Sequence, residues 1–217
     1  MLAHRFSRRA PPKAVKTIQR SDTRIIQSTI DVKFWAAGPP SCSAVRPARC
    51  PGCGVASHQP GRGAAVVGHG LRSREVEGPS EPGEAPTSTS VAARRYRCLA
   101  CGAVLVVVPR GVGRALRYTL DAIGYALALW GYAQVTAERA RRAVSSAKAR
   151  GLSAPEQWSS LRRWAADAGR LFGAPKASGT LREQAKRLSS WLASQSPLAT
   201  GVVPHDAFFG GRFIHAR

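Results

Sequence analysis

Two short stretches, Cys50-Pro-Gly-Cys53-Gly54 and Cys98-Leu-Ala-Cys101-Gly102, are the strongest indication of how this chain of 217 residues folds. Each stretch places two thiols three positions apart, and the glycine that follows allows a tight turn. Two such pairs are the usual ligand set of a closed, tetrahedral zinc site. The alternative interpretations are redox pairs or unrelated thiols, but a redox pair normally occurs once, at the start of a helix. The sequence therefore favours one structural Zn²⁺ held by Cys50, Cys53, Cys98 and Cys101.

The two cysteine pairs are separated by 44 residues, more than the ~15–20 of a minimal ribbon. The excess is interpreted as a flexible insertion at about 78–91, because this stretch is rich in Pro, Ser, Gly and Thr and lacks apolar periodicity. A long loop adds little to the closure entropy, so the metal site tolerates it. Cys42, His58 and His69 have no ligand spacing and are predicted to be bystanders.

The chain is strongly basic, with 33 Lys and Arg against 12 Asp and Glu, a net charge of +21 and a pI near 11.4. Residues 1–49 carry ten basic and two acidic groups, and residues 110–195 carry fifteen and five. Such an excess favours polyphosphate partners, because neutralising phosphates releases condensed counterions. The longest apolar run, Leu120–Leu129, is too short to span a bilayer and includes Asp121. We expect no membrane partner, and thiolate ligands favour the reducing cytoplasm.

The predicted fold class is α+β: a small β zinc ribbon followed by a mainly α-helical helix-turn-helix bundle. Residues 1–45 are interpreted as a basic, disordered arm, with a possible short strand at Ile30–Trp35. The ribbon covers 46–109. Its strand candidates are Ala64–Val67, Leu71–Val76, Arg94–Arg97 and Val104–Val108. Arginines on the ribbon, including Arg94, Arg95 and Arg97, are candidates for contacts with the phosphate backbone.

Residues 110–195 are predicted to form the helical DNA-binding domain, and 196–217 a tail. Apolar spacing and end signals predict helices at Arg114–Tyr132, at Ala137–Arg150, from a capping box at Ser153–Glu156 to about Phe172, and at Thr180–Ser194. The third helix places Trp158, Leu161, Ala165, Ala168 and Phe172 on one stripe.

Polar residues occupy the other side of this third helix. Ser159 and Arg163 are candidates for contacts with base edges in a major groove, because Arg pairs well with guanine. Arg162 and Arg170 are candidates for phosphate contacts. The alternative is an ordinary amphipathic helix with a solvated basic face.

The order of these parts resembles a known family. Four stretches carry the likeness: Arg94-Arg-Tyr-Arg-Cys98-Leu-Ala-Cys101-Gly, Val108-Pro-Arg-Gly, Arg117-Tyr-Thr-Leu-Asp-Ala-Ile123 and Leu161-Arg-Arg-Trp164. Over about residues 46–172 they resemble the zinc-ribbon plus helix-turn-helix portion at the N-terminus of insertion-sequence transposases, or a short stand-alone relative of it. The resemblance implies that the third helix reads DNA through Ser159, Arg162 and Arg163. The spacer before that helix is longer than the family's tight turn.

No catalytic domain is expected, because strand transfer needs carboxylates that converge on divalent cations. The acids after the ribbon are isolated among basic residues: Asp121, Glu138, Glu156, Asp167, Glu183 and Asp206. The sequence thus predicts a non-enzymatic, zinc-dependent protein that binds double-stranded DNA, is nucleoid-associated in the cytoplasm and has no small-molecule substrate. A transposase or a second copy of the chain is a possible further partner. The alternatives are a zinc-ribbon protein-interaction module and an RNA-binding protein with non-specific electrostatics.

Overall fold

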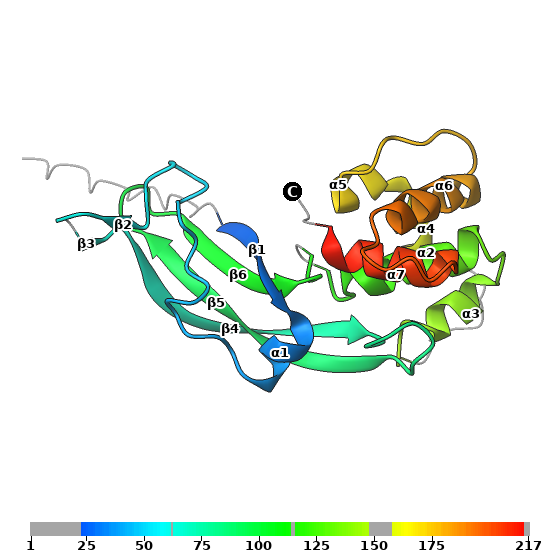
Figure 1. Ribbon diagram of the computed structural model, residues 1–217, viewed down its shortest axis with the longest axis horizontal. Helices are drawn as coiled ribbons and strands as arrows, with labels where there is room; N and C mark the ends of the chain where they lie inside the picture. The colour runs from blue at the N-terminus through cyan, green and yellow to red at the C-terminus, as the bar shows by residue number, and fades with distance from the viewer. Residues whose placement is uncertain (1–22, 62, 114–115, 148–157, 215–217) are drawn as a thin grey trace, which may run out of the picture.

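The computed structural model describes residues 23–61, 63–113, 116–147 and 158–214. The chain is α+β, as predicted, with a sheet at one end and a group of helices at the other (Figure 1). The strands are β1 (Thr23–Asp31), β2 (His58–Gln59), β3 (Gly63–Ala64), β4 (Val66–Gly78), β5 (Thr87–Cys98) and β6 (Val104–Arg110). The helices are α1 (Val32–Ala37), α2 (Leu120–Gly131), α3 (Ala137–Arg142), α4 (Ser159–Ala166), α5 (Ala168–Phe172), α6 (Leu181–Ser194) and α7 (Val203–Phe213).

The main sheet has four strands in the order β1-β6-β5-β4. β4, β5 and β6 are antiparallel neighbours, whereas β1 lies parallel to β6. The β-branched run Val104–Val108 forms most of β6, as predicted, and its residues from Leu105 to Val108 are buried. Such a run suits a strand with neighbours on both sides, because branched side chains pack well on a pleated surface.

The prediction of a disordered arm at 1–45 is wrong for residues 23–45. Thr23–Asp31 forms β1, and the Asp31 side chain accepts a hydrogen bond from Lys33 N, which caps the short helix α1. Ile30–Trp35 is therefore mostly helical rather than a strand. Trp35 is 1% exposed, and its Nε1 donates to the carbonyl of Ala92 on β5 at 2.9 Å. This buried indole ties the segment to the sheet, a long-range contact that the local sequence does not reveal. Residues 1–22 lie outside the described part.

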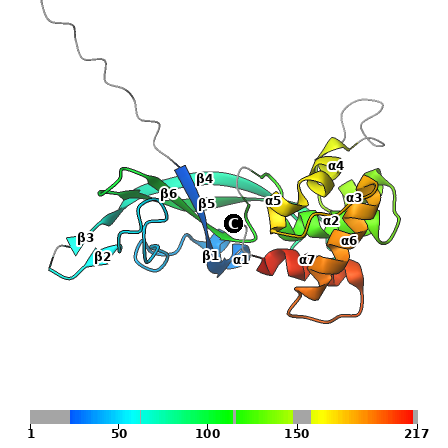
Figure 2. The same cartoon turned by 90° about the horizontal axis from the view of Figure 1, so that it is seen from above.

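The predicted flexible insertion at 78–91 is also wrong in part. β4 and β5 form one long hairpin whose pairing continues to Gly78 and Thr87, so Thr87–Val91 belongs to a strand and only 79–86 connects the two. Its far end reaches the helices (Figure 2). Cross-strand pairs and contacts at that end hold these polar residues in place, although the composition alone predicts no structure.

α2 is the centre of the helical region. Its residues from Leu120 to Ala128 are buried, and it packs against α6 and α7. It begins later than the predicted helix, because the Thr119 side chain caps it by accepting a hydrogen bond from Ala122 N. The two residues before it form isolated β-bridges, Tyr118 with Glu77 and Thr119 with Val112. The predicted fourth helix is confirmed as α6, with a full capping box between Thr180 and Glu183.

Two other predicted helices are shorter in the structure. The second ends as α3 at Arg142, and residues 148–157, which include the predicted capping box at Ser153–Glu156, lie outside the described part. The third is divided at Asp167 into α4 and α5. Asp167 has φ −95° and ψ 16°, so the backbone leaves the helical region there. Arg170 consequently does not share one continuous helix with Arg163.

The segment 196–217 is not simply a tail. Residues Val203–Phe213 form α7, Phe208 is completely buried, and Arg212 is 8% exposed. Arg212 Nε lies 3.0 Å from Asp121 Oδ2 on α2, and its Nη2 donates to the carbonyl of Ser80 at the end of the β4–β5 hairpin. α7 therefore completes the helical core and connects it to the sheet.

Among the helices of the described residues, none combines the length and apolar character needed to cross a bilayer.

Candidate metal centre and basic surfaces

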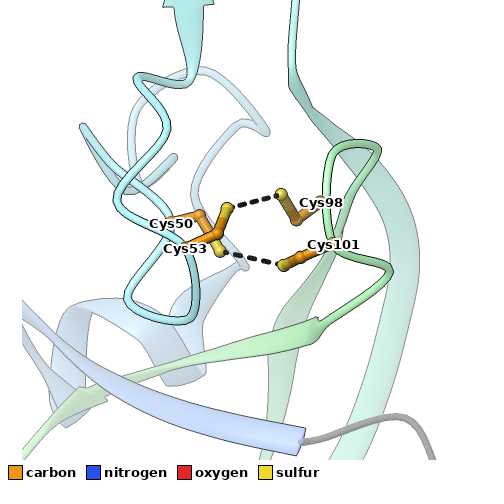
Figure 3. Close-up of side chains that lie close together, drawn as sticks. All are labelled: Cys50, Cys53, Cys98 and Cys101. Carbon is orange, nitrogen blue, oxygen red and sulfur yellow. Dashed lines mark hydrogen bonds between the residues drawn. The ribbon is translucent and has the colours of Figure 1, made fainter. Parts of the chain in front are cut away.

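The four predicted metal ligands come together at the end of the sheet away from the helices. Cys50 and Cys53 lie in the loop before β2, Cys98 ends β5, and Cys101 lies in the turn to β6. Their sulfur atoms all lie within 4.8 Å of one another. Figure 3 shows Cys50 facing Cys101 and Cys53 facing Cys98, each pair with Sγ atoms 3.7 Å apart. These separations are too long for a disulfide, whose sulfurs lie about 2.05 Å apart, and they suit four ligands around one metal ion.

The two cysteine loops have the same backbone geometry. Gly54 N donates to Cys50 O and Cys50 N donates to Val55 O, and the corresponding bonds join Gly102 to Cys98 and Cys98 to Ala103. Gly54 and Gly102 both have φ +75°, a left-handed conformation that glycine adopts without steric cost. The Cys-x-x-Cys-Gly pattern therefore determines each loop locally, and the sheet brings the two loops face to face.

The electrostatics of the cluster favour a bound cation. Burial raises the pKa of the Cys98 thiol, but hydrogen bonds from the Cys101 and Ala100 backbones outweigh this and lower it to about 7. At Cys101 the Ala103 backbone favours the thiolate, yet desolvation and the neighbouring sulfurs raise the pKa to about 12. The Cys98 thiolate thus forms readily, and a cation bound among the sulfurs would offset the cost of deprotonating Cys101.

The three residues predicted to be bystanders lie outside the cluster. In the described part of the chain, the one group of His, Cys, Asp or Glu side chains close enough to share a metal ion consists of the four cysteines. Cys42 lies beside β4, where a side chain at Gly68 would collide with its sulfur, and its carbonyl accepts a hydrogen bond from Tyr96. His58 and His69 are exposed, and His58 contacts Arg46.

The helical DNA-contact candidates lie on the surface. Ser159, Arg162 and Arg163 are exposed on α4, whose opposite face buries Leu161, Trp164 and Ala165. Arg163 Nη2 donates to Ser160 Oγ at 3.2 Å. Arg170, on α5, is exposed and pairs with Asp167 at 2.6 Å. The structure therefore brings Ser159, Arg162 and Arg163 onto one helix face and places Arg170 on the next helix.

The three arginines of the sheet that were predicted to contact DNA do not share one face. Neighbouring strand residues point to opposite faces, so Arg94 is separated from Arg95 and Arg97. Arg94 Nε donates to the carbonyl of Pro40 at 2.7 Å and holds the segment after α1 against the sheet. Arg95 is half-buried and Arg97 exposed on the other face. Arg94 is thus better explained as a structural residue than as a phosphate contact.

Sequence reasoning missed a buried polar junction between sheet and helices. The Glu77 carboxylate on β4 is fully buried, lies 2.8 Å from Arg117 Nε, and accepts hydrogen bonds from Ser145 and Ser146 after α3. The one available signal was an acidic residue next to apolar Val76 in a strand, which is uncommon unless the charge is paired.

Comparisons with known protein families, with characterised proteins and with solved structures found no match to this chain. The fold and the site define an α+β chain with a four-cysteine cluster that can bind one metal ion.

Proposed function

We propose that this chain is a zinc-dependent DNA-binding protein, derived from or associated with a transposase and without a catalytic domain. The observation that carries the proposal is the four-cysteine cluster in a chain of net charge +21. A transposase or a second copy of the chain is the further partner we expect, in the cytoplasm.

The geometry of the cluster supports zinc as the bound metal. A tetrahedron with metal–sulfur distances of about 2.3 Å has sulfur–sulfur edges of about 3.8 Å, close to the 3.7 Å between the facing cysteines. Four thiolates form a closed set that leaves no position for water, the arrangement of structural zinc sites. The ion would therefore stabilise the end of a sheet rather than perform chemistry.

The basic surfaces support DNA as the partner. α4 exposes Ser159, Arg162 and Arg163, a set of side chains suited to base edges and phosphates in a major groove. Arg95 and Arg97 add positive charge on one face of the sheet, where they would contact the backbone.

The described carboxylates after the ribbon support a non-enzymatic role, because each has a structural partner. Asp121 pairs with Arg212, Glu138 with Arg141 and Arg142, and Asp167 with Arg170. Glu183 caps α6, and Asp206 accepts hydrogen bonds from Thr200. Within the described residues no group of acids gathers to hold divalent cations.

A second candidate is a protein-interaction module. Leu99 lies between two of the cysteines and is 62% exposed, and an apolar side chain at such a position suits contact with another protein.

The first test measures bound metal and DNA selection together. Protein purified without chelator is assayed by elemental analysis, and a randomised duplex pool is selected at two salt concentrations. We expect one zinc ion per chain and an enriched motif. Arg163→Ala should relax the preference at one base position by about 1–3 kcal/mol. Arg97→Ala should weaken binding to all sequences alike and lower the slope of log affinity against log salt concentration by about one.

Two outcomes would contradict the proposal. A folded chain without metal would exclude the zinc role. Binding without an enriched motif, together with a stoichiometric protein complex that Leu99→Ser disrupts, would favour the interaction module.

A further inference from the structure

A cavity of about 630 Å³ opens between α5, the segment that follows it and α6. Its wall is apolar: Leu188 and Ala165 are buried, and the half-buried indole of Trp191 lines it. Three basic side chains, Arg170, Lys176 and Arg187, line the exposed part. We call this feature the α5–α6 cleft. Its volume lies within the range of about 300–1,000 Å³ typical of small-molecule sites.

The charge of the cleft favours an anion. Asp167, its one lining carboxylate, is paired with Arg170 at 2.6 Å. Arg187 Nη1 donates to the Ser178 carbonyl at 3.0 Å and contacts Ser178 Oγ, which holds the guanidinium beside the loop 174–178. A guanidinium fixed in this way and a lysine on the facing loop are suited to phosphate.

A phosphate alone would leave the apolar wall of the cleft without a contact. An indole beside Leu188 offers a surface on which a planar ring can stack, and stacking of bases on aromatic side chains is tolerant of sequence. A duplex is too wide for a cavity of this size, but one base with its phosphate is of the right size and chemistry.

We propose that the α5–α6 cleft binds one unpaired nucleotide of a DNA strand. The base stacks against Trp191, and its phosphate lies between Lys176 and Arg187. The proposal rests on the proposed DNA-binding function and extends it: the α4 surface contacts duplex, and the cleft accepts a nucleotide from an end, a mismatch or a melted segment.

The test measures fluorescence anisotropy of a labelled short oligothymidylate and of a labelled duplex with the full chain. Lys176→Gln and Arg187→Gln should each weaken oligothymidylate binding about five- to tenfold, with duplex affinity unchanged. Lys186→Gln is the matched control, because Lys186 is exposed on the same helix but does not line the cleft. Trp191→Ala should weaken oligothymidylate binding about tenfold, and Trp191→Phe should recover most of the lost affinity. Circular dichroism checks that each variant is folded.

The outcomes separate this inference from the proposed function. If the control and the cleft variants weaken oligothymidylate binding equally, the cleft proposal is wrong and the chain binds by general charge. If oligothymidylate binds through the cleft but duplex does not bind, the inference stands and the duplex-reading function is wrong. If free thymidine monophosphate displaces the oligonucleotide at equal concentration, the cleft is a site for free nucleotides and the proposal of a DNA strand is overturned.

Discussion

At the scale of single residues, Glu77 shows how the two parts of the chain are held together. Its Oε1 accepts hydrogen bonds from Ser145 Oγ at 2.9 Å and from Ser146 N at 2.8 Å, while Arg117 lies beside Oε2. A buried carboxylate is stable only when its charge is compensated in this way. One side chain of β4 thus joins the hairpin to the segment after α3.

We predict that Glu77→Gln lowers the free energy of unfolding by about 3 kcal/mol, because the buried charge-assisted bonds are lost. Burial raises the pKa of Glu77, but hydrogen bonds from Ser145 and Ser146 and the charge of Arg117 lower it below its ordinary value. The contribution of a depressed carboxylate is complete above its unfolded pKa of about 4.5 and disappears as the pH falls through the folded pKa.

Urea unfolding as a function of pH measures this effect. The difference between the wild type and the variant should be constant near neutral pH and shrink below about pH 4.5. Glu75→Gln is the control, because Glu75 is exposed on the same strand, and it should change stability by less than about 0.5 kcal/mol. Equal stabilities of the two variants would contradict the role of Glu77.

At the scale of elements, the helices around α2 approach so closely that glycines lie at their crossings. A Cβ at Gly210 on α7 would lie 1.8 Å from the carbonyl oxygen of Leu192 on α6, and one at Gly124 would lie 2.7 Å from Ala207 O. Backbone atoms at these positions cannot move aside as a flexible side chain can. The packing of α2, α6 and α7 therefore depends on the absence of side chains at these crossings.

We predict that Gly210→Ala destabilises the chain by about 3 kcal/mol or more, because α7 must shift away from α6. Gly169→Ala is the control, because a Cβ at Gly169 would meet only Ala174 O, at a normal van der Waals distance of 3.5 Å. That change should be neutral or stabilise by up to about 1 kcal/mol through a less flexible unfolded chain. Thermal unfolding followed by circular dichroism distinguishes the two, and a neutral Gly210→Ala would argue against this packing.

At the scale of the whole molecule, the cysteine cluster and the helices occupy opposite ends of one sheet. Val66 pairs with Cys98 at the end of the β4–β5 hairpin that carries the cysteine cluster, and Gly78 pairs with Thr87 at the end near the helices. The helical region has its own core around α2, whereas the loops around the cysteine cluster contribute few buried apolar residues. The two ends should therefore respond differently to loss of metal.

We predict that a chelator removes hydrogen-exchange protection from residues 50–57 and 98–104 and leaves the amides of α2, α6 and α7 protected. Cys50→Ser should have the same local effect without chelator, and Cys42→Ser should have none, because Cys42 lies outside the cluster. Exchange measured by mass spectrometry tests this. Uniform loss of protection along the chain would show that the metal supports the entire fold.

The sequence by itself determined the features that depend on neighbouring residues. The Cys-x-x-Cys-Gly loops, the β-branched strand β6 and the capped helix α6 each have a local cause, in turn geometry, side-chain shape or hydrogen bonding at a helix end. The α+β class followed from the change of apolar period between the two halves. The four cysteines of the cluster could be named because their spacing within each loop is what one ion requires.

Only the tertiary structure decided the features that depend on partners far along the chain. β1 is a strand because β6 offers a free edge, Thr87–Ser90 is ordered because it pairs with the end of β4, and α7 is a helix packed on α2. Thr87–Ser90 is polar and α7 contains Gly210 and Gly211, so local preference is weak there, whereas β1 is rich in Ile and Thr but can pair only with a strand far along the chain. Distant contacts therefore determine the conformation of all three segments. The Glu77 junction and the α5–α6 cleft likewise exist only where separate elements meet.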